Sequence, residues 1–219
     1  MQSFAVIPAA GRSRRMGRPK LLLPWGKSTI IEQVLEAWRR STVTRVVMVV
    51  HPDDAQLAAV AQKQDALVVQ PEEAPPEMKD SVRVGLRAID KQFSPSDDDV
   101  WLLAPADMPT LSADVIDQLL AAYGQCVAAG NVERATIWAP TFEGRRGHPV
   151  LFPWPLAAEV ASLSAEEGIN ALVRRHTVRT VEAASGAIHD DLDTPEDYRR
   201  LLADGKISNH AGPADEAEV

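Results

Sequence analysis

Short apolar runs alternate along the chain with segments in which apolar residues recur every three or four positions. The short runs predict strands at 3–7, 45–50, 66–69, 100–104, 135–139, 149–152 and 178–181. The helical spacing predicts helices at 28–38, 52–63, 80–92, 112–123, 156–163 and 168–176, and a further helix that starts at 194. This regular alternation is typical of an α/β protein, in which helices cover both faces of a mostly parallel sheet.

Polar stretches separate these elements. Residues 70–77 are rich in proline and glutamate, and 105–110 and 141–148 are short polar segments, so all three are predicted to be loops. Residues 204–219 are polar and rich in alanine, and we expect a disordered tail there. A length of 219 residues fits one large domain better than two, which predicts a single domain over 1–203.

Composition narrows the choice of function. The net charge is −8, and an acidic protein lacks the basic face that general nucleic-acid binding needs. Cys126 is the single cysteine of the sequence, so an internal disulfide is excluded and a reducing, cytoplasmic location is expected. No apolar run approaches transmembrane length, and the chain opens on a strand pattern, so we expect neither a membrane span nor a signal peptide.

The positive charge of the chain is concentrated in one stretch, 5–24. An apolar run ends there at Pro8, and the small residues Ala9, Ala10 and Gly11 follow it. Five cations come next, namely Arg12, Arg14, Arg15, Arg18 and Lys20. Small residues let backbone N–H groups approach an anion, and guanidinium and ammonium groups neutralise it, so the stretch is predicted to hold a polyphosphate. The alternative is a basic surface loop; the glycine spacing matches neither a Rossmann fingerprint nor a P-loop.

An aspartate follows another predicted strand. Asp107 comes directly after the run 100–104, and ligands of parallel sheets bind outside the carboxyl ends of the strands. The cationic stretch sits at such an end too, so both are expected to face one crevice. A carboxylate beside phosphates needs a cation between them, and Mg²⁺ is held by one or two carboxylates plus phosphates. Asp107 is therefore predicted to bind Mg²⁺; its alternative role is that of a turn residue or a helix cap.

A second acidic cluster contains Asp190, Asp191 and Asp193, just before Thr194 and Pro195. Carboxylates this close repel one another unless a cation or a helix N-terminus stabilises them. Threonine as the cap and proline at the first helical position predict such a helix start. Helix stabilisation thus accounts for some of the three carboxylates, and a metal remains the alternative for the others.

Two further segments carry candidate binding residues. Arg146, Gly147 and His148 belong to a basic, glycine-flanked loop that suits an anionic acceptor, or else forms a solvated hairpin tip. A phosphate acceptor is already ionised near neutral pH and needs no general base, so His148 is interpreted as a binding residue. Ser81 is either a helix cap or a residue of the nucleotide site.

The opening stretch resembles a known family. Its Ala9-Ala10-Gly11, Arg15-Met16-Gly17 and Pro19-Lys20 segments are similar to the opening motif of the MobA-like NTP transferases, most of all to the molybdenum cofactor cytidylyltransferase branch. The resemblance extends over residues 4–203. It implies a three-layer α/β/α fold of the glycosyltransferase-A type, CTP rather than GTP as the nucleotide, molybdopterin as the phosphate-bearing acceptor, and possible contact with a molybdoenzyme or its chaperone.

The resemblance also assigns roles to single residues. Asp107-Met108-Pro109 is similar to the family's metal-binding motif, and the segment 191–197 implies Asp193 as the second metal ligand. The segment 77–82 resembles a turn beside the base and ribose, which places Ser81 in the nucleotide site. Gly147-His148-Pro149 resembles the element that faces the acceptor. The chain departs from the family at Glu77, where glycine is usual, and at 165–171.

These assignments predict nucleotidyl transfer. Ala9, Ala10, Gly11 and Arg12 would bind the nucleotide, Arg15 and Lys20 would neutralise its phosphates, and Asp107 and Asp193 would hold Mg²⁺. A sugar-phosphate or another small phosphate is an alternative acceptor. A non-catalytic nucleotide-binding protein that delivers a cofactor is an alternative of a different class. Neither nucleic acid nor a membrane is expected as a partner.

Overall fold

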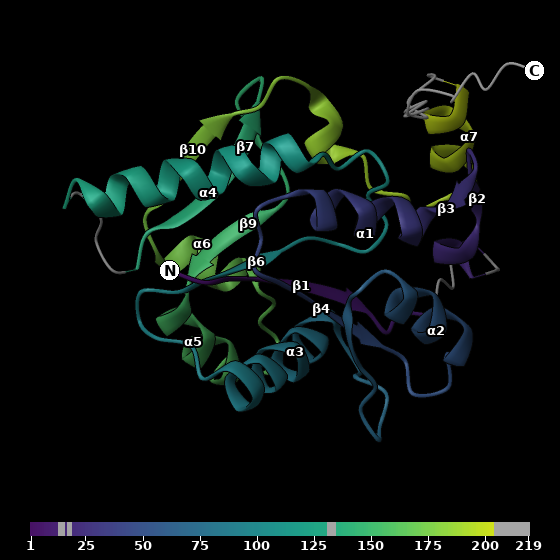
Figure 1. Ribbon diagram of the computed structural model, residues 1–219, viewed down its shortest axis with the longest axis horizontal. Coiled ribbons are helices and arrows are strands. Elements are labelled where there is room, and N and C mark those ends of the chain that lie inside the picture. The colour runs from purple at the N-terminus through teal and green to yellow at the C-terminus, as the bar shows by residue number, and fades with distance from the viewer. Residues whose placement is uncertain (13–15, 17–18, 131–134, 204–219) are drawn as a thin grey trace, which may run out of the picture.

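The computed structural model describes residues 1–12, 16, 19–130 and 135–203. Within these ranges eight strands form one sheet, and a small hairpin stands apart from it (Figure 1). The sheet consists of β1 (Ser3–Ala9), β4 (Arg45–Val50), β5 (Leu67–Val69), β6 (Val100–Leu103), β7 (Ile137–Phe142), β8 (Arg145–Arg146), β9 (Val150–Pro153) and β10 (Val178–Glu182). The hairpin pairs β2 (Pro24–Trp25) with β3 (Ser28–Thr29).

Helices follow most of the strands. They are α1 (Ile30–Arg40), α2 (Ala55–Lys63), α3 (Met78–Phe93), α4 (Ala113–Ala128), α5 (Ala157–Ala161), α6 (Asn170–Arg175) and α7 (Pro195–Ala203). Short 3₁₀ turns are η2 (Lys20–Leu22), η3 (Trp154–Leu156) and η4 (Gly186–His189). None of the described helices is both long enough and apolar enough to cross a lipid bilayer.

The sheet is mostly parallel, as its pattern predicts. Its strand order is β10-β7-β9-β6-β1-β4-β5, and β8 pairs with β7. β1 is hydrogen-bonded in parallel to β4 on one side and to β6 on the other. β9 runs antiparallel between β6 and β7. Because β1 and β6 are parallel neighbours, the turns after them leave the same edge of the sheet, where the site lies.

The helices form two layers, one on each face of the sheet (Figure 1). In β1, Ala5 and Ile7 pack into the core that contains α1, α2 and α4. The alternate residues, Phe4 and Val6, pack into the core beneath α3, α5 and α6. This alternation buries β1 on both faces, as a central strand requires. The three-layer α/β/α fold is thereby confirmed.

Several element bounds differ from the predicted ones for local reasons. α2 begins at Ala55 rather than near 52, because the Asp54 carboxylate caps it by accepting a hydrogen bond from the Leu57 N–H at 3.0 Å. α1 is capped by Thr29, which forms a reciprocal capping box with Glu32. The helix predicted from 28 therefore begins two residues later, since Ser28 belongs to β3.

Two predictions concern helix starts that flank the site. α3 begins at Met78 with Glu77 as its cap, so Ser81 lies inside the helix and the interpretation of Ser81 as a cap was wrong. α7 begins at Pro195, which confirms the helix start predicted after Thr194. The tail predicted for 204–219 lies outside the described residues.

Candidate active site

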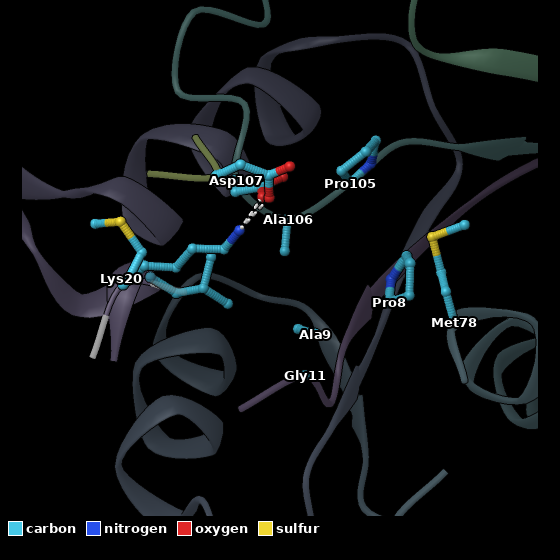
Figure 2. A pocket seen from close by; sticks show the side chains of 11 residues that line it. Pro8, Ala9, Gly11, Lys20, Met78, Pro105, Ala106 and Asp107 are labelled. Atoms are coloured by element: carbon cyan, nitrogen blue, oxygen red, sulfur yellow. Dashed lines mark hydrogen bonds and ion pairs between the residues drawn. The ribbon is translucent and has the colours of Figure 1, made fainter. Parts of the chain in front are cut away.

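A cavity of about 290 Å³ opens at the carboxyl edge of β1 and β6 (Figure 2). One wall comes from β1 and the turn after it, and another from the turn after β6. Lys20 of η2 and Met78 at the start of α3 approach from opposite sides. The wall residues from the two turns are Pro8, Ala9, Gly11, Pro105, Ala106 and Asp107. The predicted convergence of the opening stretch and Asp107 on one crevice is therefore present.

The Lys20 ammonium lies between two carboxylates. It forms an ion pair with Asp107 Oδ2, and Asp193 Oδ1 lies 3.4 Å from its Nζ. It also donates a hydrogen bond of 2.7 Å to the backbone carbonyl of Leu192. The side chains of Lys20 and Asp107 are only 16% and 12% exposed, so solvent screens their attraction weakly. The segments around residues 20, 107 and 192 are far apart in sequence and are brought together by the Lys20 ammonium group.

The two oxygens of the buried Asp107 carboxylate have different surroundings, since Oδ2 contacts Lys20 and Oδ1 does not. Burial raises its pKa, whereas the charge and hydrogen bond of Lys20 lower it, and the net direction is upward. Its Oδ1 is buried and has no hydrogen-bond partner among the described residues. A buried acceptor without a donor is costly, and a cation would satisfy it. Asp193, whose Oδ1 also faces the Lys20 ammonium, supplies a second carboxylate close to Asp107.

These oxygens fit a hard divalent cation. Mg²⁺ takes oxygen ligands and is bound through one or two carboxylates plus substrate phosphates rather than by an all-protein cage. The described residues contain no cluster of three or more metal-binding side chains. The two carboxylates of Asp107 and Asp193 are enough for a Mg²⁺ ion that also binds substrate phosphates. Asp191, the alternative ligand, is exposed.

Hydrogen bonds to the backbone and from the Asp197 side chain's neighbours fix the segments that carry the two carboxylates. The Leu192 N–H donates to the backbone carbonyl of Asp107 at 3.0 Å, which joins the Asp193 segment to the turn after β6. The Asp197 carboxylate accepts hydrogen bonds from the Thr194 N–H at 2.9 Å and the Thr194 hydroxyl at 2.7 Å. It also accepts one from the Asp193 N–H at 3.3 Å. Asp197 thus orients the residue that carries the second carboxylate.

The residues predicted to bind the nucleotide occupy different places. Ala9 and Gly11 line the cavity, whereas Ala10 and Ser81 are buried and do not line it. Arg15 lies outside the described residues. Arg12 lines an adjoining cavity of about 360 Å³, where its guanidinium lies 3.2 Å from both His51 Nε2 and Asp53 Oδ2.

The predicted acceptor loop supplies no residue to the lining of this cavity. Arg146 is exposed in β8, and Gly147 packs so closely against η4 that a Cβ there would lie 2.4 Å from the Ile188 carbonyl oxygen. His148 is largely buried. Burial lowers its pKa, although a hydrogen bond to the backbone of Leu103 and the charges of Asp191 and Asp107 oppose this. Its Nδ1 is buried and has no partner in the described part of the chain.

Met78 was not named as a site residue, although it belongs to the segment 77–82 that was expected beside the base and ribose. Its side chain is 53% exposed and lines the cavity opposite Lys20 (Figure 2). A single exposed apolar residue is ordinary on a protein surface, and its place at the cavity cannot be read from the sequence. The Leu192 carbonyl was missed as well, because no side-chain pattern marks a backbone acceptor.

The fold and the site together define a nucleotidyltransferase: a turn of small residues, a lysine and two carboxylates meet at one edge of an α/β/α sheet. A sequence model of the MobA-like NTP transferase domain matches residues 5–181. The chain belongs to this family and is an enzyme rather than a non-catalytic accessory protein.

Curated relatives differ in the acceptor and the base they use. The chain is 29% identical to the 2-C-methyl-D-erythritol 4-phosphate cytidylyltransferase of Frankia casuarinae, over 95% of this chain and 67% of the relative. It is 29% identical to the molybdenum cofactor guanylyltransferase of Xanthomonas euvesicatoria (90% and 93%). It is 22% identical to the molybdenum cofactor cytidylyltransferase of Escherichia coli (88% and 92%).

A solved structure has a similar fold. It is the complex of Rv0371c from Mycobacterium tuberculosis H37Rv with manganese. The two chains are 25% identical, with a TM-score of 0.71, and the match covers 93% of this chain and 99% of that one.

Proposed function

We propose that this enzyme transfers CMP from CTP to the phosphate of a molybdopterin-type acceptor and releases pyrophosphate. A phosphate oxygen of the acceptor attacks the α-phosphorus of CTP, a new phosphorus–oxygen bond forms, and the bond from the α-phosphorus to the bridging oxygen of the leaving pyrophosphate breaks. The observation that carries the proposal is the convergence of Lys20, Asp107 and Asp193 beside Gly11 in one cavity.

The residues of this chain would contribute by position and charge. Ala9 and Gly11 offer a close approach for the triphosphate, and Lys20 neutralises its charge. Asp107 and Asp193 would hold Mg²⁺, which would supply positive charge that neutralises the phosphates. No residue has to act as a covalent nucleophile, because the acceptor phosphate supplies the attacking oxygen.

Cytidine is preferred because the opening motif resembles the cytidylyltransferase branch, and two of the three relatives named above are cytidylyltransferases. Because one relative is a guanylyltransferase, GTP is the alternative nucleotide. His148, on whose pKa the charges of Asp191 and Asp107 act, supports an acceptor site outside the described cavity. Its Nδ1 is buried without a described partner, so a donor group on the acceptor would satisfy it.

A second acceptor class has a specific observation in its favour. A relative that matches 95% of this chain acts on 2-C-methyl-D-erythritol 4-phosphate, which is a small phosphorylated polyol. The second candidate function is therefore cytidylyl transfer to a polyol phosphate.

Pyrophosphate release tests these proposals directly. CTP, GTP and UTP are each incubated with Mg²⁺ and with molybdopterin or 2-C-methyl-D-erythritol 4-phosphate. We expect rapid release with the pair of CTP and molybdopterin and slow release when either is replaced. Faster release with GTP would overturn the assignment of the base, and faster release with the polyol phosphate would overturn that of the acceptor.

A further inference from the structure

Lys20 is fully engaged by the groups proposed to bind a metal. An ammonium group has three protons, and the Lys20 Nζ faces three acceptors: a carboxylate oxygen of Asp107, the Leu192 carbonyl at 2.7 Å and a carboxylate oxygen of Asp193 at 3.4 Å. Figure 2 shows its side chain extended toward Asp107. The protein thus places a cation of its own between the two carboxylates.

This arrangement conflicts with the proposed role of Lys20 toward phosphate. While Asp107, Leu192 and Asp193 accept its protons, the ammonium has to give up these contacts before it can bind a phosphate. A divalent cation held by both carboxylates would also lie beside the ammonium, and like charges in a poorly exposed site repel strongly. The carboxylate contacts of Lys20 and the binding of a metal therefore exclude one another.

The carboxylates would stay in place if Lys20 left. The backbones of Asp107 and Leu192 are hydrogen-bonded to each other at 3.0 Å, and Asp197 holds Thr194 at 2.9 Å, and neither contact involves Lys20. The lysine, in contrast, approaches on a four-carbon stem with many rotamers. The mobile partner of the ion pair is thus the lysine side chain.

We infer that Lys20 is a resident counter-ion that occupies the metal position until a nucleotide arrives. The phosphates then draw the ammonium away from Asp107 and Asp193 and open both carboxylates to a divalent cation. The nucleotide-free enzyme consequently binds the cation weakly, and nucleotide and cation enter as a coupled pair. This inference rests on the proposed function, because it takes Asp107 and Asp193 as the metal ligands.

Binding of Mn²⁺ to the nucleotide-free protein, followed by electron paramagnetic resonance, tests this inference without any turnover. Lys20→Gln and Lys20→Met remove the ammonium, and Lys20→Met also keeps an apolar stem for packing. Both variants are expected to bind Mn²⁺ roughly 10-fold or more tightly than the wild type. Lys27→Gln is the matched control, because it removes the same charge from an exposed position and should leave the affinity unchanged.

The outcomes separate the inference from the proposed function. Adding Asp107→Asn to Lys20→Gln should abolish the gain in affinity. The inference alone would be overturned by two results together. In the first, both Lys20 variants bind Mn²⁺ no more tightly than the wild type; in the second, the wild type binds Mn²⁺ in the presence of CTP, and this binding depends on Asp107. No Mn²⁺ binding by the wild type even with CTP, or binding unaffected by Asp107→Asn, would overturn the proposed metal site and the inference together.

Discussion

The phenol of Tyr198 in α7 donates a hydrogen bond to the backbone carbonyl of Pro24 in β2, and the two oxygens lie 2.6 Å apart. This contact joins the helix that follows Asp193 to the hairpin that follows Lys20. It therefore ties together two of the three segments that form the active site, outside the site itself.

Replacing Tyr198 with Phe removes this hydrogen bond and keeps the ring. The free energy of unfolding is expected to fall by about 1 kcal/mol, the usual net contribution of one such bond. Chemical denaturation of the wild type and the variant measures the difference. An unchanged midpoint and slope would show that α7 does not depend on the contact.

Lys20→Ala and Asp107→Ala remove a positioned charge from the reaction centre. Each is expected to lower the rate of pyrophosphate release by roughly 10²–10³, the usual loss for one preorganised electrostatic group. Circular dichroism should show an intact fold in both variants. Lys27→Gln should keep normal turnover, and near-normal turnover in either site variant would remove that residue from the mechanism.

Asp197 makes the start of α7 sensitive to acid. Hydrogen bonds from Thr194 hold the pKa of Asp197 below its ordinary value of 3.8, although burial partly opposes them. Because its pKa is depressed in the folded state, Asp197 stabilises the fold fully above about pH 3.8 and loses this effect as the pH falls through the folded pKa.

Asp197→Asn isolates this contribution. Unfolding is measured between pH 2 and 7 for both proteins, and the variant is expected to be less stable than the wild type at pH 7 and to approach it as the pH falls. A stability difference that stays constant over this range would contradict the assignment.

Two glycines of the site should respond differently to a methyl group. A Cβ on Gly147 would meet the Ile188 carbonyl at 2.4 Å, so Gly147→Ala is expected to destabilise the fold by roughly 1–3 kcal/mol. A Cβ on Gly11 would have no described heavy atom within 4 Å. Gly11→Ala should therefore fold normally and weaken CTP binding, as calorimetry would show. Normal CTP affinity in Gly11→Ala would mean that the nucleotide does not approach this backbone.

Much of the fold could be predicted because its strands and helices differ in period. The apolar run at 45–50 and the helical spacing around Ile30, Val34 and Trp38 each indicate one type of element. The hairpin of β2 and β3 was not predicted, because strands of two residues have no period to detect. The insertion of β9 between β6 and β7 depends on long-range pairing, which local patterns do not encode.

For Lys20, Asp107 and Asp193 the sequence indicated that the residues lie together, and not how their side chains contact one another. Parallel strands bring Lys20 and Asp107 to one edge of the sheet, so their proximity follows from topology. Their direct ion pair depends on side-chain conformations that packing selects. Arg12 shows the same limit: its position in the chain indicates phosphate binding, whereas here its guanidinium lies beside His51 and Asp53.

The most direct test of the account is calorimetric titration of CTP into the protein in the presence of Mg²⁺. The wild type and Lys27→Gln are expected to bind CTP with equal affinity, and Asp107→Asn is expected to bind it roughly 10-fold or more weakly, because the cation loses its buried ligand. Absence of CTP binding by the wild type, or equal affinity in Asp107→Asn, would contradict the claim that Lys20, Asp107 and the Gly11 turn form one nucleotide site.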